Sequence, residues 1–122
     1  MKSLCFLANK NKVIRMILKV VVDDQTYPIS VPEEIISGAG DFFNKIDRDM
    51  DNGWQMSRDW VDKPDQEQRC QIVGDKMLTA MHNNNEKLMV LLSAYVLARV
   101  PGVTGLRIDT NGEMLETELV VG

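Results

Sequence analysis

The sequence is poor in the residues that most often build metal centres. Its 122 residues include one histidine and two cysteines, Cys5 and Cys70, which lie far apart in the chain. Zinc sites take three or four ligands, mostly closely spaced Cys and His, so a zinc centre is not expected. The cysteines show no redox spacing either, and isolated thiols suit a reducing compartment. Because Cys70 falls on the apolar face of a predicted helix, we expect an inert buried thiol.

Catalytic signatures are also missing. The sequence has no glycine-rich phosphate loop, no nucleophile elbow and no zinc-protease helix motif. His82 falls near the end of a predicted helix, where its charged form suits the helix dipole. We therefore expect no enzyme, although the paired carboxylates Asp59 and Asp62 leave acid–base chemistry open.

Long hydrophobic runs and an excess of positive charge are absent as well. Fourteen basic against eighteen acidic residues give a net charge of −4, which argues against a nucleic-acid partner. The apolar run near the N-terminus is too short for a signal peptide or a membrane span. We predict a cytoplasmic protein without a membrane or nucleic-acid partner, with residues 1–12 as a loose N-terminal extension and residues 13–122 as a single domain.

The first regular pattern is a pair of alternating segments. Residues 13–22 place Ile14, Met16, Leu18, Val20 and Val22 on one face. The other face mixes apolar and cationic residues, so we expect a central strand covered on one side. A turn at Asp23-Asp24 leads to a second alternating segment around Pro28, which lacks an amide hydrogen and favours a sheet edge.

The middle of the chain has helical patterns. Pro32 with two following glutamates begins a helix, and a second amphipathic stripe is formed by Phe43, Ile46, Met50 and Trp54 at spacings of three, four and four. Ser57 and Val61 prolong this stripe if the helix survives Asn52-Gly53. Further on, Asp65 and Gln68 form a capping box before another helix. Residues 86–100 are apolar around most of the helix circumference, so this helix should be the most buried.

A second hairpin is predicted near the C-terminus. Leu106 and Ile108 alternate with polar residues, Asn111-Gly112 is a strong turn signal, and a last alternating segment follows over residues 115–119. The resulting order predicts an α+β two-layer sandwich, ββ-ααα-ββ, with a mostly antiparallel four-stranded sheet and helices on one face. A β-grasp-like fold is the alternative, suggested by the opening hairpin and the helix after it, although the helical middle is long for that fold.

Charge on the two hairpins favours a particular strand order. Arg15 and Lys19 on the first strand complement Glu116 and Glu118 near the last. Opposite charges on neighbouring strands stabilise their pairing. We therefore predict that the first strand lies beside the last strand rather than beside the third.

The densest acidic cluster is formed by Asp47, Asp49 and Asp51. Alternating aspartates before a glycine resemble an EF-hand calcium loop, which needs glycine at position six and a bidentate carboxylate at position twelve. Counted from Asp47, these positions hold Asn52 and Arg58, so the pattern fails twice. On a helix, Asp49 also projects away from the other two. We favour a solvated helix face, and a calcium or magnesium site is the alternative.

Both tryptophans lie just after this cluster. Trp54, Met56 and Trp60 could form an exposed aromatic patch for a protein partner, and on a helix Arg58 would stack between Trp54 and Asp62. The alternative places Trp54 in the core with Trp60 covering its rim, because large aromatic residues dominate cores as readily as interfaces.

Two blocks of the sequence carry a family resemblance. Asp47–Val61 (DRDMDNGWQMSRDWV) and Pro101–Thr110 (PGVTGLRIDT) resemble the recognisable blocks of a small family of uncharacterised bacterial proteins. The similarity runs from about residue 15 to about residue 119. That family has no established activity, ligand or catalytic residue, so the resemblance implies no function.

Two functions remain as hypotheses. The first is a small cytoplasmic interaction or regulatory module without catalytic activity or cofactor, binding a protein partner or a second copy of itself. Its eight methionines suit adaptable interfaces. The second is a divalent-cation-binding protein that uses the acidic cluster, with weak hydrolytic activity.

Overall fold

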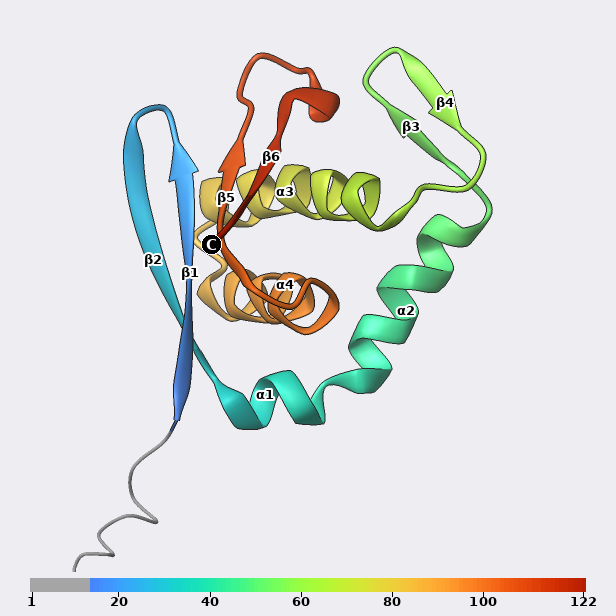
Figure 1. Cartoon of the computed structure of the whole chain (residues 1–122). Helices are drawn as coiled ribbons and strands as arrows, with labels where there is room; N and C mark the ends of the chain where they lie inside the picture. Colours follow the sequence, from blue (N-terminus) through green and yellow to red (C-terminus); the bar gives the residue numbers. More distant parts are fainter. Residues whose placement is uncertain (1–13) are drawn as a thin grey trace, which may run out of the picture.

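The computed structural model describes residues 14–122 (Figure 1), and the predicted extension over residues 1–12 lies outside the described residues. In chain order the elements are β1 (Arg15–Val22), β2 (Gln25–Pro32), α1 (Glu33–Gly38), α2 (Gly40–Asp51), β3 (Trp54–Met56), β4 (Asp59–Val61), α3 (Gln66–His82), α4 (Glu86–Arg99), β5 (Val103–Ile108), the 3-10 helix η2 (Met114–Glu116) and β6 (Glu118–Val121). The described residues thus form a mixed α/β protein. In it, a main sheet lies beside the helices and a separate small hairpin projects from them (Figure 1). The predicted order ββ-ααα-ββ is correct only in part, because the described residues form four α-helices and the small hairpin β3–β4 lies between α2 and α3.

The main sheet has four strands in the order β2-β1-β5-β6. The pairs β1/β2 and β5/β6 are antiparallel, whereas β1 and β5 are parallel. The prediction that the first strand lies beside the last is therefore wrong, because β5 separates them. The charge pairing expected between the first and last strands is made by β5 instead. Arg107 of β5 pairs with Glu118 of β6 at 2.9 Å, whereas Lys19 of β1 lies opposite Gly105 of β5.

The first hairpin follows the sequence pattern closely. β1 lies between two strands and β2 lies at a sheet edge, as the mixed second face of β1 and Pro28 predicted. Asp23 and Asp24 both have positive φ, 50° and 69°. Two such residues are typical of the tight turns that match the twist of a hairpin. The apolar face of β1 is buried at Leu18 and Val20, which are inaccessible, but not at the start of the strand, where Met16 is exposed.

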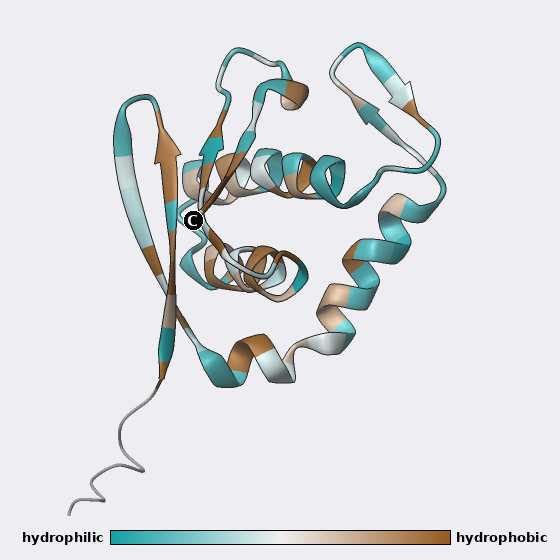
Figure 2. Ribbon diagram, viewed as in Figure 1, coloured by the Kyte–Doolittle hydropathy of each residue, from teal (hydrophilic) through white to brown (hydrophobic). Residues whose placement is uncertain are grey.

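The core lies between the sheet and the two long helices, α3 and α4. The sheet contributes Leu18, Val20, Val31, Leu106 and Ile108, and the helices contribute Ile72, Val73, Met77, Leu92, Tyr95 and Val96. Figure 2 shows the hydrophobic colour concentrated on β1 and α4, with α2 and the small hairpin mostly hydrophilic. The expectation that the helix over residues 86–100 is the most buried is confirmed, because α4 has seven buried residues among 14, whereas α3 has seven among 17.

Helix α3 begins at the predicted capping box. The Asp65 side chain accepts a hydrogen bond from the Gln68 amide at 2.8 Å, and the Gln68 side chain accepts one from the Asp65 amide at 2.9 Å. Cys70, on the helix face turned to the core, is completely buried as expected, and His82 is the last residue of the helix. No helix within residues 14–122 combines the length and the hydrophobicity required to cross a membrane.

The second helical stripe ends earlier than its spacing suggested. Helix α2 stops at Asp51, and Trp54 and Val61 lie on the paired strands β3 and β4 instead of prolonging the helix. Gly53 has a φ of +107°, which an L side chain adopts only with strain, and a Cβ there would collide with the Trp60 ring. The predicted stacked row of Trp54, Arg58 and Asp62 is therefore wrong.

The C-terminal hairpin is looser than predicted. The Asp109 carboxylate accepts hydrogen bonds from the amides of Asn111 and Glu113, at 2.9 and 3.0 Å, and η2 follows before β6 begins at Glu118. Gln71 of α3 donates to the Leu115 and Thr117 carbonyls, each at 3.1 Å. This buried amide holds the irregular connection against α3, so residues 115–117 are not part of a strand.

Candidate interaction site

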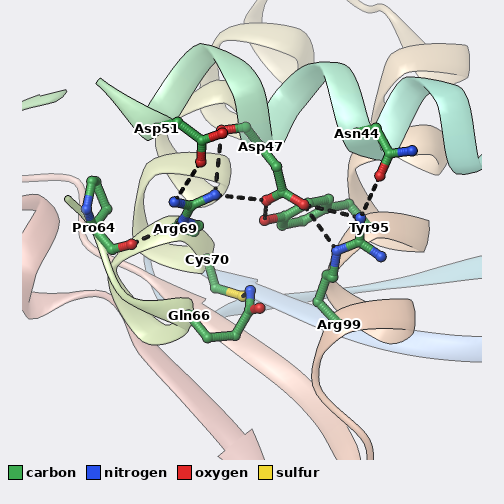
Figure 3. A network of polar contacts seen from close by, with 9 residues as sticks. All are labelled: Asn44, Asp47, Asp51, Pro64, Gln66, Arg69, Cys70, Tyr95 and Arg99. Carbon is green, nitrogen blue, oxygen red and sulfur yellow. Dashed lines mark hydrogen bonds and ion pairs between the residues drawn. The ribbon is translucent and has the colours of Figure 1, made fainter. Parts of the chain in front are cut away.

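Asp47 lies where α2 crosses the N-terminal end of α3 and the C-terminal end of α4 (Figure 3). Its carboxylate accepts hydrogen bonds from Tyr95 Oη at 2.6 Å, from Arg99 at 3.1 and 2.9 Å and from Arg69 at 3.1 Å. Arg69 also binds Asp51 at 2.9 Å and donates to the Pro64 carbonyl at 2.9 Å. Arg99 also donates to the Asn44 side-chain oxygen at 3.4 Å. The Asp47 cluster consists of these side chains: Asn44, Asp47, Asp51, Arg69, Tyr95 and Arg99. It ties all three helices together.

Electrostatics keep the Asp47 cluster in fixed charge states. Burial by itself would raise the pKa of Asp47, but hydrogen bonds from Tyr95, Arg99 and Arg69 outweigh burial, and the pKa is lowered. Burial would lower the pKa of Arg69, yet its bonds to Asp51 and Asp47 raise it. Both groups are therefore ionised over the whole neutral range.

The neighbouring thiol and phenol are held neutral. Burial raises the pKa of Cys70 to about 11. Burial and the hydrogen bond to Asp47 raise the pKa of Tyr95 well above its usual value. General acids and bases work best with a pKa near the operating pH. Neither of these two groups is tuned in that direction.

The predicted cation ligands do not converge. Asp47 and Asp51 share one face of α2 and are bound by Arg69, while Asp49 pairs with Lys45 at 3.3 Å. Within residues 14–122 no group of three or more Asp, Glu, His or Cys side chains could hold a metal ion. Arginine donors thus occupy the oxygens that a calcium ion would need.

The small hairpin places the predicted interaction residues on two different faces. Met56 is completely buried and Trp54 half-buried, whereas Trp60 is 57% exposed. Trp60 pairs with Gln55 across the hairpin, and directly opposite residues share a face, so Trp60 lies on the face opposite to Trp54 and Met56. One exposed patch of all three residues does not form. Trp54 packs against the core, whereas Trp60 is largely exposed to solvent.

Arg58 anchors the tip of the small hairpin. Its guanidinium pairs with Glu113 at 2.9 Å, and the Ser57 hydroxyl donates to the Gly112 carbonyl at 2.6 Å and accepts from the Met114 amide at 2.9 Å. These bonds join the hairpin to the β5–β6 connection. The sequence did not predict this role of Ser57. The local signal for it is a polar residue between two short segments that favour β-strands, a pattern typical of a turn.

Trp54 borders a pocket that sequence reasoning did not find. The pocket has a volume of about 470 Å³ and we name it the Trp54 pocket. Its lining residues are Phe42, Lys45, Ile46, Asp49, Trp54, Asp75, Lys76, Thr79, Leu88 and Leu92. The Lys76 ammonium lies 4.7 Å from the centre of the Trp54 ring, a cation–π arrangement. The pocket therefore combines apolar walls with lysines and aspartates of opposite charge.

Comparisons with known proteins add no further information about this site. No family model, no curated protein and no solved structure matches the chain.

Proposed function

We propose that this protein is a small cytoplasmic interaction module without catalytic activity, and that it binds a protein partner through the Trp54 pocket. The observation that carries the proposal is the pocket itself. Its volume of about 470 Å³ lies within the usual range for binding sites, and helices α2, α3 and α4 form most of its wall. A surface built on helices is rigid enough to present a fixed shape to a partner.

The chemistry of the pocket favours one kind of occupant. Its apolar walls fit a large apolar side chain, the usual anchor of a protein interface. On α2, Lys45 and Asp49 form an exposed ion pair beside the pocket, and on α3 Asp75 and Lys76 are adjacent. An amphipathic partner helix, with one large apolar residue flanked by charges of both signs, matches this surface.

The charge states around the Asp47 cluster support a role other than catalysis. The pKa shifts of the Asp47 carboxylate, the Arg69 guanidinium, the Tyr95 phenol and the neighbouring Cys70 thiol all lead away from neutrality. The alternative function, divalent-cation binding with weak hydrolysis, is less well supported because Arg69 and Arg99 already neutralise Asp47. Membership of the small bacterial family stays a prediction and adds no activity.

A matched pair of variants tests the proposal. Thr79→Trp fills the Trp54 pocket from α3, and Thr26→Trp makes the same change on the exposed surface of β2. Each protein is immobilised and exposed to an extract of the source cells, and captured proteins are quantified by mass spectrometry. We expect a protein that is retained by the wild type and by Thr26→Trp but at least about tenfold less by Thr79→Trp, a difference of about 1.4 kcal/mol.

Two results would overturn the proposal. One is equal retention of every captured protein by Thr79→Trp and Thr26→Trp. The other is the absence of any protein retained above an unrelated immobilised control. Circular dichroism of both variants must match that of the wild type, so that loss of capture reports on the pocket.

A further inference from the structure

The two edges of the main sheet differ in how they are protected. At one edge, β2 carries Pro28 in its middle, and helix α4 packs against the strand. At the other edge, β6 has no proline, and its one charged residue, Glu118 at the start of the strand, is paired with Arg107 of β5. Its residues Val120 and Val121 are 39% and 62% exposed. Natural edge strands are usually blocked by proline, by charge or by a covering element, because their free backbone groups pair with other strands.

We propose that β6 pairs antiparallel with β6 of a second copy of this chain, joining the two main sheets into one. An antiparallel edge is complementary to itself, because a two-fold axis brings the free donors of one strand to the free acceptors of the identical strand. This inference concerns β6, which contributes no residue to the Trp54 pocket. It therefore stands independently of the proposed function.

The pattern of side chains on β6 selects a register. Glu118 and Val120 lie on one face of the strand, and Leu119 and Val121 on the other. A two-fold axis at Val120 places this residue beside Val120 of the partner subunit. It also places Leu119 beside Val121 of the partner subunit, so that apolar residues meet on both faces.

Charge is compatible with this register. Glu118 is paired with Arg107 of its own chain at 2.9 Å. With the axis at Val120, the two Glu118 carboxylates of the dimer are displaced by four residues along the strands, about 14 Å. Salt screens exposed charges beyond about 8 Å at physiological ionic strength, so repulsion between them is small.

The size of the edge determines the strength of association. β6 has four residues, and two such edges bury far less than the roughly 1,200–2,000 Å² of a stable interface. We therefore expect a reversible dimer whose population rises with protein concentration. Sedimentation velocity from about 10 µM to about 1 mM covers the range of weak association.

Two pairs of variants separate edge pairing from other dimers. Val121→Lys adds a positive charge to the β6 edge. Ile17→Lys is the control, because it adds the same charge to β1, away from that edge, at a residue that is 53% exposed. We expect association of the wild type and of Ile17→Lys but at least about tenfold weaker association of Val121→Lys. In a Cys5→Ser background, Val120→Cys should form a disulfide between copies on mild oxidation, while Ile17→Cys should not.

Other outcomes would overturn the inference. A wild type that remains monomeric at about 1 mM, the upper limit of the weak range, would do so. Association lost in Ile17→Lys but kept in Val121→Lys would indicate stacking of sheet faces instead. Failure of Val120→Cys to cross-link under conditions where the wild type associates would exclude this register.

Discussion

Asp47 is the residue that joins the helical layer. It lies on α2, whereas its partners Arg69, Tyr95 and Arg99 lie on α3 and α4. Arg99 also stacks within 5.6 Å of the Phe43 ring and 5.5 Å of the Tyr95 ring. Because Arg69 lies on α3 and both Tyr95 and Arg99 lie on α4, the Asp47 carboxylate links α2 to two other helices, and these three helices line most of the Trp54 pocket.

Removing the charge of Asp47 should destabilise the fold. Asp47→Asn keeps the size of the side chain but cannot accept from two guanidiniums and a phenol. Hydrogen bonds to charged groups contribute about 1.5–3 kcal/mol each at most sites, and we expect a loss in that range. The Asp49 carboxylate pairs, among residues 14–122, with exposed Lys45 alone, so Asp49→Asn should change the free energy of unfolding by less than about 0.5 kcal/mol. Urea melts of both variants measure the difference, and equal losses would contradict the role assigned to Asp47.

Calcium should not bind the acidic cluster. Asp47 and Asp51 are engaged by Arg69, and Asp49 points to another partner. We expect no saturable calcium binding by calorimetry at about 0.15 M salt, where exposed charges are screened within about 8 Å. Micromolar binding that disappears in Asp49→Asn would instead support the cation-binding alternative.

The small hairpin shows why the end of α2 was predicted wrongly. Phe43, Ile46, Met50 and Trp54 have continuous helical spacing, and periodicity alone gives no reason to stop at Asp51. The stop depends on Gly53, on its positive φ, and on contacts of Ser57 with residues more than fifty positions away. Such long-range contacts are invisible to a pattern read along one segment.

Glycine is required at position 53 for two reasons. Its φ of +107° strains any L residue, and a Cβ would collide with the Trp60 ring. We expect Gly53→Ala to cost about 1–3 kcal/mol, the range for local backbone strain. It should also alter tryptophan emission, because Trp60 must move away from Asp62, which its indole N–H binds at 2.7 Å. Gly112→Ala is the control: the φ of Gly112 is also positive, at 83°, but a Cβ there meets no atom of the described residues within 4 Å. Unchanged emission in Gly53→Ala would contradict this role.

Helix α4 could be predicted well because its own composition carries the signal. Leu92 is only 1% exposed. Replacing it with alanine should cost about 2–5 kcal/mol, the range for truncating a buried leucine. The matched change at Leu115, which is 40% exposed, should cost less than about 1 kcal/mol. Chemical denaturation of the two variants tests the ranking, and a reversed order would show that the core is wrongly placed.

At the scale of the whole molecule, elements were easier to predict than their arrangement. The edge position of β2 followed from Pro28, a property of one residue. The strand order did not follow from any single residue, because Arg15 and Lys19 complement the C-terminal acidic residues in several arrangements. The parallel pairing of β1 with β5 depends on the four helices between them returning the chain to the sheet. The Trp54 pocket likewise has walls from residues 42–92 and no local signature.

The stability of the whole molecule should be greatest over an interval bounded by two groups. The pKa of Asp47 is lowered in the folded state. Its contribution is therefore present above the unfolded pKa of about 3.9 and is lost as the pH falls through the lower folded value. Burial raises the pKa of Cys70 to about 11. That contribution is present below the unfolded pKa of about 8.5 and is lost as the pH rises through the folded value.

Urea midpoints measured from about pH 2 to about pH 11 test both limits, which follow from these pKa values. We expect a plateau between roughly pH 4 and pH 8.5, with stability falling on either side. Asp47→Asn should lower the plateau and flatten the acid limb, because the amide that replaces the carboxylate binds no proton in either state. Cys70→Ala should flatten the alkaline limb between about pH 8.5 and pH 10 and leave the acid limb unchanged; above about pH 10, the unfolded pKa of tyrosine, Tyr95 also contributes because its pKa is raised in the fold. An acid limb of equal steepness in Asp47→Asn and the wild type would assign the acid sensitivity to other carboxylates.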